Sequence, residues 1–507
     1  MRKITALVTL AFALSSCNLA PTYQRPFMPI PDHFKETGKW VPVKIAPSQG
    51  TPGPWWLVFH DHTLNELEEN IIPANQDLKA AFARYQEASA LAQVARAGLF
   101  PTIEAISNVS RQKTSVTIAN PGTMPLYNNY LIGGDLNYEI DVWGSIRNAV
   151  KQGKALAKAS EADLAAATLS LHAALANDYF SLRAADESQR ILDTTVAAYQ
   201  KALYLTKQRH KGGAAPIADV DEAETQLENA KTLAADIRLQ RAQLEHAIAI
   251  LIGKFPADFS LPPGKLPRDY INIAPDLPST LLERRPDIMA AELRVEAANA
   301  NIGIARAAFF PQFDLSGILG VQSKRVSNLF SKPSLFWSIG PATALSLIQP
   351  TASLILFDGG KLSGLLRHAN ASYFETVANY RQTVLTAVQE VEDNLIAIRQ
   401  LDKEKVTASA SSRAALRALV QSKYRYIGGV ITFLEVVVVE NQALQAEIAE
   451  VNIRLRRQIA SVQLIKALGG GWFITPPTKT KSHQHPHKRL SGNTYSLIQM
   501  KKTQAAH

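Results

Sequence analysis

The fold of this chain is decided by the stretch LLERRPDIMAAELRVEAANANIGIARAAFFP (residues 281–311), because an echo of it, DLKAAFARYQEASALAQVARAGLFP, occupies residues 77–101. Asp287 in the later stretch matches Asp77 in the earlier one, so the two run in register at an offset of 210. Self-similarity at a fixed offset is the signature of a chain built from repeated structural units. The sequence therefore predicts a pseudo-symmetric protein made of two copies.

Glycines extend the repeat beyond residue 311. At an offset of 216, the matching pairs are Gly144 with Gly360, Gly213 with Gly429, and Gly253 with Gly469. Each copy reads as a short helix, two strands, a long helix and a second helix, about 175 residues in all, which is typical of one domain. We expect the copies at residues 62–253 and 281–471, with a linker at residues 254–280.

Composition excludes several classes of protein. With 46% apolar and 19% charged residues, the chain is neither disordered nor a polytopic helical membrane protein. Its formal charge of +10 includes a basic tail at residues 472–507, which we expect to be disordered. No groove-reading motif accompanies that charge, so we expect no nucleic-acid partner. No Walker loop, metal-ligand cluster or nucleophile–base string is present, and we expect neither enzymatic activity nor a cofactor.

The N-terminus predicts export and lipidation. Residues 1–16 have the layout of a secretory signal peptide, with two cations, an apolar core and a pair of small residues. The string LSSC, which ends at Cys17, looks like a bacterial lipobox, in which the cysteine is acylated. An ordinary signal followed by a stray cysteine is the alternative. The lipobox is favoured because Cys17 is the only cysteine in the chain.

The residues after the lipobox predict an anchored arm. Asn18 stands where an aspartate commonly signals retention at the inner membrane, so the motif points to the outer membrane. Residues 17–61 include a proline-rich stretch and lack a sustained period, and we expect them to form an extended, lipid-anchored arm.

Alternating residues predict strands. Asp135, Asn137, Glu139 and Asp141 fall on one face of residues 135–142, and Leu136, Tyr138, Ile140 and Val142 on the other. We expect strands at about 102–118 and 130–143, and at about 312–326 and 336–357 in the second copy. They suit either a soluble antiparallel sheet or a transmembrane barrel, whose smallest single-chain examples have about eight strands. Four strands cannot close such a barrel, so the barrel interpretation requires several chains.

Long helices follow the strands in both copies. We expect them at residues 145–210 and 361–426, each followed by a returning helix at residues 217–252 or 432–468. A helix of about 65 residues reaches nearly 100 Å, which no bilayer matches. Charges along these helices exclude a hydrocarbon environment, so the helices must project through water. Glycine pairs, Gly212-Gly213 and Gly428-Gly429, end the long helices, as expected for left-handed caps.

Several strings together resemble a known family. They are the lipobox followed by APTY (residues 20–23), LLERRPDI, ARAAFFP, DGG (residues 358–360) and ALGGGW (residues 467–472). These resemble the TolC-like outer-membrane channels of tripartite efflux pumps, specifically their lipoprotein branch. The resemblance covers roughly residues 14–473 and implies an α+β membrane protein, in which three chains close a 12-stranded outer-membrane β-barrel on a periplasmic α-helical barrel.

The resemblance also implies a function and partners. The homotrimer would be a passive exit duct in the outer membrane of a Gram-negative bacterium, for drugs or other small solutes. A periplasmic membrane-fusion adaptor and an inner-membrane pump of the resistance-nodulation-division type would deliver them. Two alternatives share parts of the pattern: a type I protein-secretion duct, and a non-conducting structural envelope lipoprotein. The strand alternation disfavours the structural lipoprotein, and the lipobox with ALGGGW disfavours the secretion duct.

In the resembled family the periplasmic tips are the gate. Here the matching tips carry Gly212, Gly213, Gly428 and Gly429, where we expect adaptor contact. The family often has a leucine and, four residues later, an aspartate, and this chain has Leu434 and then Val438. We expect Leu434 to plug the aperture, with Val438 making its inner side more apolar. Glu435, Asp219 and Asp221 are candidates for an acidic ring, and equally for helix-start acids stabilised by the dipole.

Overall fold

The computed structural model describes residues 18–36, 54–113, 126–268, 271, 280–341 and 352–470. The signal segment, the predicted lipidation site Cys17 and the tail at residues 472–507 lie outside the described residues. Among the helices that are described, none is both long enough and apolar enough to cross a membrane.

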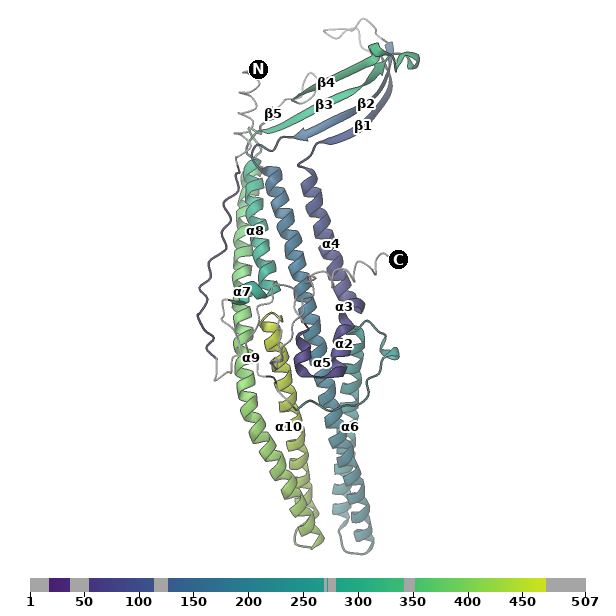
Figure 1. Ribbon diagram of the computed structural model, residues 1–507. Helices are drawn as coiled ribbons and strands as arrows, with labels where there is room; N and C mark the ends of the chain where they lie inside the picture. Colours follow the sequence, from purple (N-terminus) through teal and green to yellow (C-terminus); the bar gives the residue numbers. More distant parts are fainter. Residues whose placement is uncertain are drawn as a thin grey trace, which may run out of the picture. The chain divides into compact units, whose positions relative to one another are not determined.

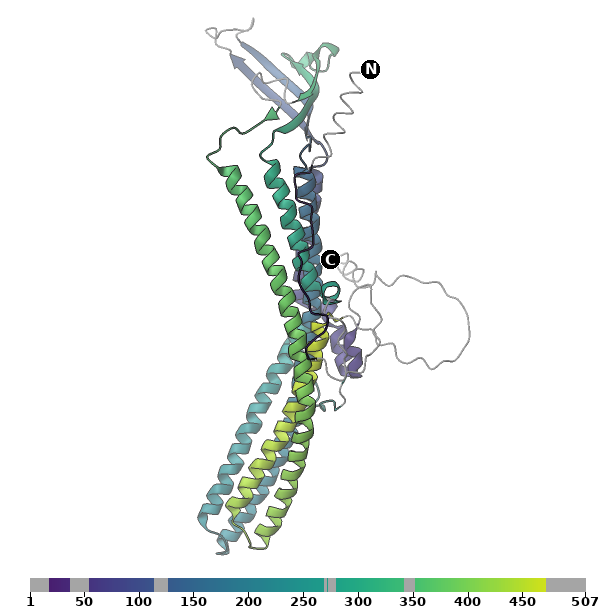
Figure 2. The same cartoon turned by 90° about the vertical axis from the view of Figure 1, so that its left-hand side faces the viewer.

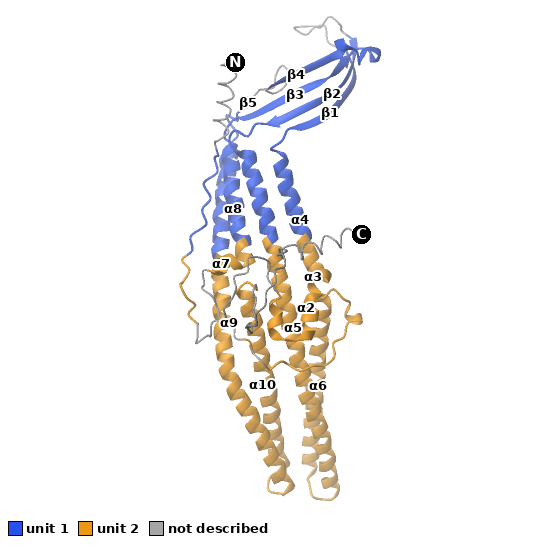
Figure 3. Ribbon diagram, in the orientation of Figure 1, with its two compact units in different colours: residues 1–28, 83–161, 290–381 blue, residues 29–82, 162–289, 382–507 orange. Residues whose placement is uncertain are grey.

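The chain forms two compact units (Figure 3). Unit 1 comprises residues 1–28, 83–161 and 290–381, and unit 2 comprises residues 29–82, 162–289 and 382–507. These units differ from the two tandem copies expected from the sequence, because each unit takes segments from both copies. The repeat is therefore a repeat of elements, and the long helices contribute residues to both units.

The principal elements follow one another in the same order in both copies: a helix, two strands, a long helix and a returning helix (Figure 1). The first copy contains η1 (Trp55–Phe59), α2 (His62–Glu69), α3 (Ile71–Ala74), α4 (Gln76–Ala97), β1 (Thr102–Lys113), β2 (Leu126–Glu139), α5 (Ser145–Lys211) and α6 (Ile217–Leu251). The second contains α7 (Leu281–Arg284), α8 (Pro286–Ala307), β3 (Gln312–Ser323), β4 (Leu335–Pro341), β5 (Ala352–Ser353), α9 (Lys361–Ile427) and α10 (Phe433–Ala467).

The strands of unit 1 form one antiparallel sheet in the order β1-β2-β3-β4, with the short β5 paired to the start of β3. At its centre Gly133 of β2 faces Gly320 of β3. A Cβ added at Gly320 would lie 2.5 Å from the carbonyl oxygen of Ile132, so only glycine allows the two central strands to pair this closely. Of the strand expected at about 336–357, residues 342–351 lie outside the described part.

Register places most of the apolar side chains of the four strands on one face of the sheet. Ile103 pairs with Leu136, Leu136 with Gly317, and Gly317 with Ile339, so these residues share a face. Leu319 and Trp337 also pair, and their side chains are 60% and 70% exposed. The opposite face carries mainly polar side chains: Glu104, Asn108, Asp135, Asn137, Asp314, Ser316 and Gln322. Among the described residues, no core covers this apolar face.

One sequence expectation is wrong at the end of β2. The alternation predicted a strand through Val142, but β2 ends at Glu139. The carboxylate of Asp141 instead accepts hydrogen bonds from the backbone amides of Ile146 and Arg147, at 3.1 and 2.9 Å. The Asp141 carboxylate therefore satisfies amides in the first turn of α5 that have no acceptor within the helix. A position on a solvated strand face also requires a polar residue, so the sequence did not distinguish the two.

The second copy uses the same device at a shifted position. Asp358 accepts a hydrogen bond from the amide of Leu362 at 2.6 Å, and Leu362 matches Ile146 at the offset of 216. Both long helices thus begin on a carboxylate, although the two aspartates do not align in sequence.

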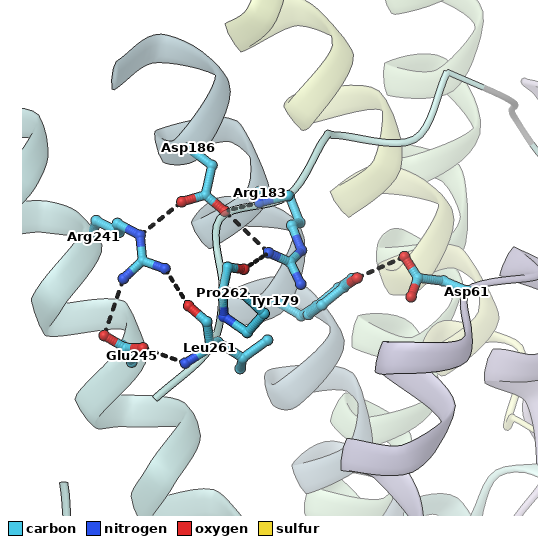
Figure 4. Close-up of polar contacts among 9 residues, drawn as sticks. Asp61, Tyr179, Arg183, Asp186, Arg241, Glu245, Leu261 and Pro262 are labelled. Atoms are coloured by element: carbon cyan, nitrogen blue, oxygen red, sulfur yellow. Dashed lines mark hydrogen bonds and ion pairs between the residues drawn. The ribbon is translucent and has the colours of Figure 1, made fainter. Parts of the chain in front are cut away.

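Within unit 2, charged side chains of α5 and α6 bind the connection between the two copies (Figure 4). Arg241 of α6 pairs with Asp186 of α5 at 2.7 Å and donates a hydrogen bond to the carbonyl of Leu261. Arg183 bonds the same Asp186 at 3.0 Å and the carbonyl of Pro262 at 2.8 Å. The buried guanidinium of Arg183 and the partly buried one of Arg241 therefore satisfy backbone acceptors of a segment that forms no regular structure there.

Candidate functional site at the helix-hairpin tips

Each long helix of unit 2 ends in a tight turn of the same geometry. Gly213 and Gly429 have φ values of +75° and +73°, and an added Cβ at either would meet nothing within 4 Å. The amide of Ala214 donates to the carbonyl of Arg209 at 2.8 Å, and that of Val430 donates to Arg425 at 2.9 Å. Both turns therefore have the hydrogen bond of a Schellman cap, and glycine is needed for its backbone angle alone.

The helices that return from the two turns begin differently. α6 begins after Pro216 without a side-chain cap, whereas α10 begins with a capping box between Thr432 and Glu435. The Glu435 carboxylate bonds the amide of Thr432 at 3.3 Å. In the protomer, then, Glu435 caps its own helix, as a helix-start acid does. Asp219 lies in the first turn of α6, and Asp221 lies exposed just after it.

An apolar core joins the two hairpins at their tips. It consists of Tyr199, Leu203, Val220, Ala223, Leu227, Ala230, Phe433 and Val437, with Val196 and Tyr426 packed against it. These residues come from α5, α6, α9 and α10, and both views show the two turns side by side (Figures 1 and 2). Burial, together with the nearby Glu440, raises the pKa of the Tyr199 phenol.

Polar contacts add to this core, some of them between the hairpins. The guanidinium of Arg209 in α5 lies over the ring of Tyr426 in α9, with 4.6 Å to the ring centre. Asn441 of α10 donates to the side chain of Gln226 in α6 at 3.1 Å. Within the second hairpin, Lys423 forms an ion pair with the buried Glu440 at 2.8 Å. These contacts hold the tip of one hairpin against the other.

Leu434 and Val438 lie on the other side of α10. Their neighbours Phe433 and Val437 are buried in the tip core, while Leu434 and Val438 are 59% and 48% exposed. The two are four residues apart and so share one face of the helix, one turn after the other. Two adjacent apolar side chains on the exposed face of a helix tip form a surface that other chains can cover.

The structure does not gather the predicted aperture residues into one cluster within the chain. Leu434, Glu435 and Val438 lie on α10, and Asp219 and Asp221 on α6. In the part of the chain that the structure describes, these side chains make no hydrogen bond or ion pair with one another. Sequence reasoning missed Arg209, Tyr426 and Asn441. Only Tyr426 carried a signal, as an aromatic residue two positions before the glycine pair at a solvated turn.

The chain belongs to the outer membrane efflux protein family, whose model matches residues 68–254 and 277–470. It is 31% identical over 479 residues to the probable efflux pump outer membrane protein TtgC of Pseudomonas putida, covering 93% of this chain and 96% of that protein. It is 32% identical over 475 residues to the outer membrane protein OprJ of Pseudomonas aeruginosa, covering 92% and 96%.

Solved structures show the same fold. The outer-membrane channel OprN superposes with a TM-score of 0.82 at 30% identity, covering 90% of this chain and all of that one. The combination of a four-stranded sheet, with its apolar face uncovered, and two long helical hairpins is thus the architecture of an outer-membrane efflux channel.

Proposed function

We propose that three copies of this outer-membrane efflux channel form the exit duct of a tripartite system that exports drugs or other small solutes. The observation that carries the proposal is the common apolar face of β1, β2, β3 and β4. A face of this kind fits lipid on the outside of a barrel, with the polar face toward a water-filled lumen. Four strands leave two edges unpaired, so one chain cannot close a barrel. The likeness to the outer membrane efflux protein family supports three chains, which would supply twelve strands.

The helices supply the rest of the duct. α5 and α9 have 67 residues each, which corresponds to about 100 Å of helix. Helices of that length, with charges throughout, extend far beyond a bilayer. We infer that they form the wall of a periplasmic tunnel and that their tips, at Gly212, Gly213, Gly428 and Gly429, are where a periplasmic adaptor binds. Solutes from an inner-membrane pump would then pass without any chemical step.

The tip core and its cross-hairpin contacts support a gate at the same end. Arg209 and Asn441 hold the two hairpins of a protomer together, while Leu434 and Val438 remain exposed on α10. In a trimer, three copies of this pair would meet at the axis and close the tunnel with an apolar constriction, which resists wetting by ions. Adaptor binding would open it by separating the hairpins.

At the other end, we propose that Cys17 is acylated and holds the N-terminus at the outer membrane. The lipobox supports this proposal, as does the arm that begins at the next residue. Acyl chains contribute roughly 0.8 kcal/mol for each buried methylene, so several chains give a stable anchor.

Drug susceptibility of a deletion strain tests the function. Complementation with the chain should restore resistance to small toxic compounds. A Gly320→Ala chain should fail to restore it, because the new Cβ meets the carbonyl of Ile132, whereas Gly317→Ala in the same strand meets nothing closer than 3.6 Å and should succeed. Unaltered drug susceptibility on deletion, with loss of a secreted protein instead, would contradict the efflux function and favour the secretion duct.

A further inference from the structure

The stretch that defines the repeat carries one feature that its echo lacks. Along α8, five residues spaced three or four apart form a single stripe: Glu292, Glu296, Asn299, Gly303 and Arg306. At the offset of 210 the first copy has Phe82, Gln86, Ser89, Gln93 and Arg96, with neither the acids nor the glycine. The two copies therefore differ on one face of otherwise corresponding helices. We expect this face of α8 to contact a segment that has no counterpart in the first copy.

What it meets is the N-terminal arm, within unit 1. Arg306 donates a hydrogen bond to the carbonyl of Leu19 at 3.2 Å, and Asn299 donates to that of Pro21 at 2.8 Å. Two turns further back, Glu292 forms an ion pair with Arg25 at 2.5 Å. The arm thus runs antiparallel to α8. Residues seven apart on the helix hold successive parts of an extended peptide.

Gly303 allows the closest approach. A Cβ at this position would lie 2.6 Å from the Cβ of Ala20 and 2.5 Å from the side-chain nitrogen of Asn148. Real Cβ atoms do not come this close to other atoms, so any larger residue at 303 would displace the arm or Asn148. The glycine also lies in the interior of a helix, where it costs stability relative to alanine. Contact with the arm explains why a glycine occupies this position.

Side-chain hydrogen bonds make the contact between the arm and the helices depend on particular residues of the arm. The carboxamide of Asn148, fully buried in the first turn of α5, donates to the side-chain oxygen of Asn18 at 2.9 Å. That same oxygen accepts the amide of Ala20 at 3.1 Å. The hydroxyl of Tyr23 donates to the carboxylate of Glu292 at 3.5 Å, so Tyr23 also lies against the stripe. Burial raises the pKa of the Tyr23 phenol, and the nearby carboxylates of Glu292 and Glu296 raise it further.

We propose that the α8 stripe, together with Asn148, is a peptide-binding seat for residues 18–25, and that it fixes the residue following the acylation site beside the ends of α5 and α8 that adjoin the strands. The second part rests on the proposed lipidation of Cys17. In this view Asn18 has a structural role: its side chain locks the first turn of the arm onto α5. The seat would hold the arm whether or not acyl chains are attached.

A nitroxide attached at Thr22→Cys in the full-length, detergent-purified protein tests the seat, because Thr22 is an exposed residue of the arm. The electron paramagnetic resonance line should show an immobilised label in the parent chain. Gly303→Ala should convert most of the signal to a mobile component. Gly364→Ala is the matched control: Gly364 aligns with Asn148 in the other copy, lies in α9, and has nothing within 4 Å of an added Cβ.

Asn148→Ala provides a second variant that adds no bulk, and it should give a smaller mobile fraction than Gly303→Ala. Circular dichroism would verify that each variant remains helical. An immobilised label in both Gly303→Ala and Asn148→Ala would overturn the seat. The mass of the N-terminal peptide separately reports acylation of Cys17. An unmodified Cys17 would refute the lipid anchor. Because its free thiol would also take the label, the measurement would then be read in a Cys17→Ser background, where release of the label by Gly303→Ala would leave the peptide seat standing.

Discussion

The guanidinium of Arg285 donates a hydrogen bond to the backbone carbonyl of Ala467, with 3.1 Å between Nη1 and the oxygen. This bond joins the start of α8 to the end of α10. The first copy has the same junction with a different residue: Asn75, at the start of α4, donates to the carbonyl of Leu251 at 2.9 Å. In each copy one side chain therefore satisfies a helix C-terminal carbonyl that would otherwise lack a partner.

Replacing Arg285 by alanine should destabilise the protein strongly. Its side chain is buried and also pairs with Asp287 and Glu390, at 2.7 Å each. Loss of the cation leaves the carbonyl of Ala467 without this donor, while water can solvate the two partly exposed carboxylates, so we expect a cost of about 2 kcal/mol. Thermal unfolding of the purified protein measures it. Arg413→Ala, at an exposed position of α9, is the control, and its free energy of unfolding should stay within about 0.5 kcal/mol of the parent. Equal melting points for the two variants would contradict this role of Arg285.

Local patterns predicted the elements and failed for contacts between distant segments. Helices over residues 145–210 and 361–426 followed from composition without breakers, and the apolar strand faces followed from a period of two. Asp141 shows that sequence patterns can also fail for residues close together in the chain, because a solvated strand residue and a helix-capping carboxylate look alike in sequence. The arm shows it at long range. Asn18 and Asn148 meet across 130 positions, and no periodicity records such a pair.

The same limit applies to the candidate gate. Comparison of the copies located both turns, since glycines mark them. Burial of Phe433 and exposure of Leu434 depend on packing among four helices. The pattern of a single helix does not specify them when apolar residues are consecutive, as they are from Val436 to Val439. The sequence nominated Leu434 and Val438 through a family resemblance, and only the fold shows that they share the face turned away from the tip core.

Truncation of Leu434 should make the closed channel leak. If three copies of this side chain fill the aperture, Leu434→Ala widens the constriction and weakens its apolar barrier, so closed-state conductance in planar bilayers should rise several-fold. Leu239→Ala removes a similarly exposed leucine from α6, away from the turns, and should leave conductance as in the parent. A closed-state conductance unchanged by Leu434→Ala would remove Leu434 from the gate.

Introducing an acid at position 438 should change ion preference. A ring of carboxylates facing the lumen attracts cations, so Val438→Asp should shift the reversal potential in a salt gradient toward cation selectivity. Val438→Asn is the control, because it adds polarity without charge. If both variants show the same reversal potential, Val438 does not face the conducting path.

Loosening the contact between the hairpins should favour the open tip. Tyr426 packs against Phe433 with 5.5 Å between ring centres and lies under the Arg209 guanidinium. Tyr426→Leu removes both interactions. A loss of roughly 1 kcal/mol corresponds to about a fivefold change in the open-to-closed ratio, which single-channel recording can resolve.

Tyr426→Phe provides the matched comparison. It keeps the ring, and the phenol oxygen it removes is buried without a hydrogen-bond partner among the described residues. We therefore expect gating close to that of the parent. If Tyr426→Leu also gates like the parent, the aromatic contact does not hold the tip closed.

A buried pair in unit 2 should shape the pH dependence of stability. Glu68 of α2 and His172 of α5 are 0% and 4% exposed, and their side chains bond at 2.6 Å while Trp56 stacks on the imidazole. Burial lowers the pKa of His172 from 6.5 to about 4 and raises that of Glu68 well above 4.5. Between these two folded-state pKa values, the pair therefore holds one proton and carries no net charge.

The pair changes stability with pH wherever the folded and unfolded states bind different numbers of protons. At pH values above 6.5 where burial still keeps Glu68 protonated in the folded state, the unfolded pair has released both protons while the folded pair keeps one. Stability should therefore fall as the pH rises, until the folded pKa of Glu68 is passed. Glu68→Gln removes the loss at high pH. It should instead lose stability as the pH falls from 6.5 toward 4, because only the unfolded histidine then takes up a proton.

Melting temperatures at about pH 5, 7 and 9 distinguish the two profiles. The parent should lose more than Glu68→Gln between the middle and the high value, and less between the middle and the low value. Glu69→Gln, at the exposed neighbouring position, removes the same formal charge and should keep the parent profile. Parallel profiles for the parent and Glu68→Gln would mean that the buried pair does not hold the proton assigned to it.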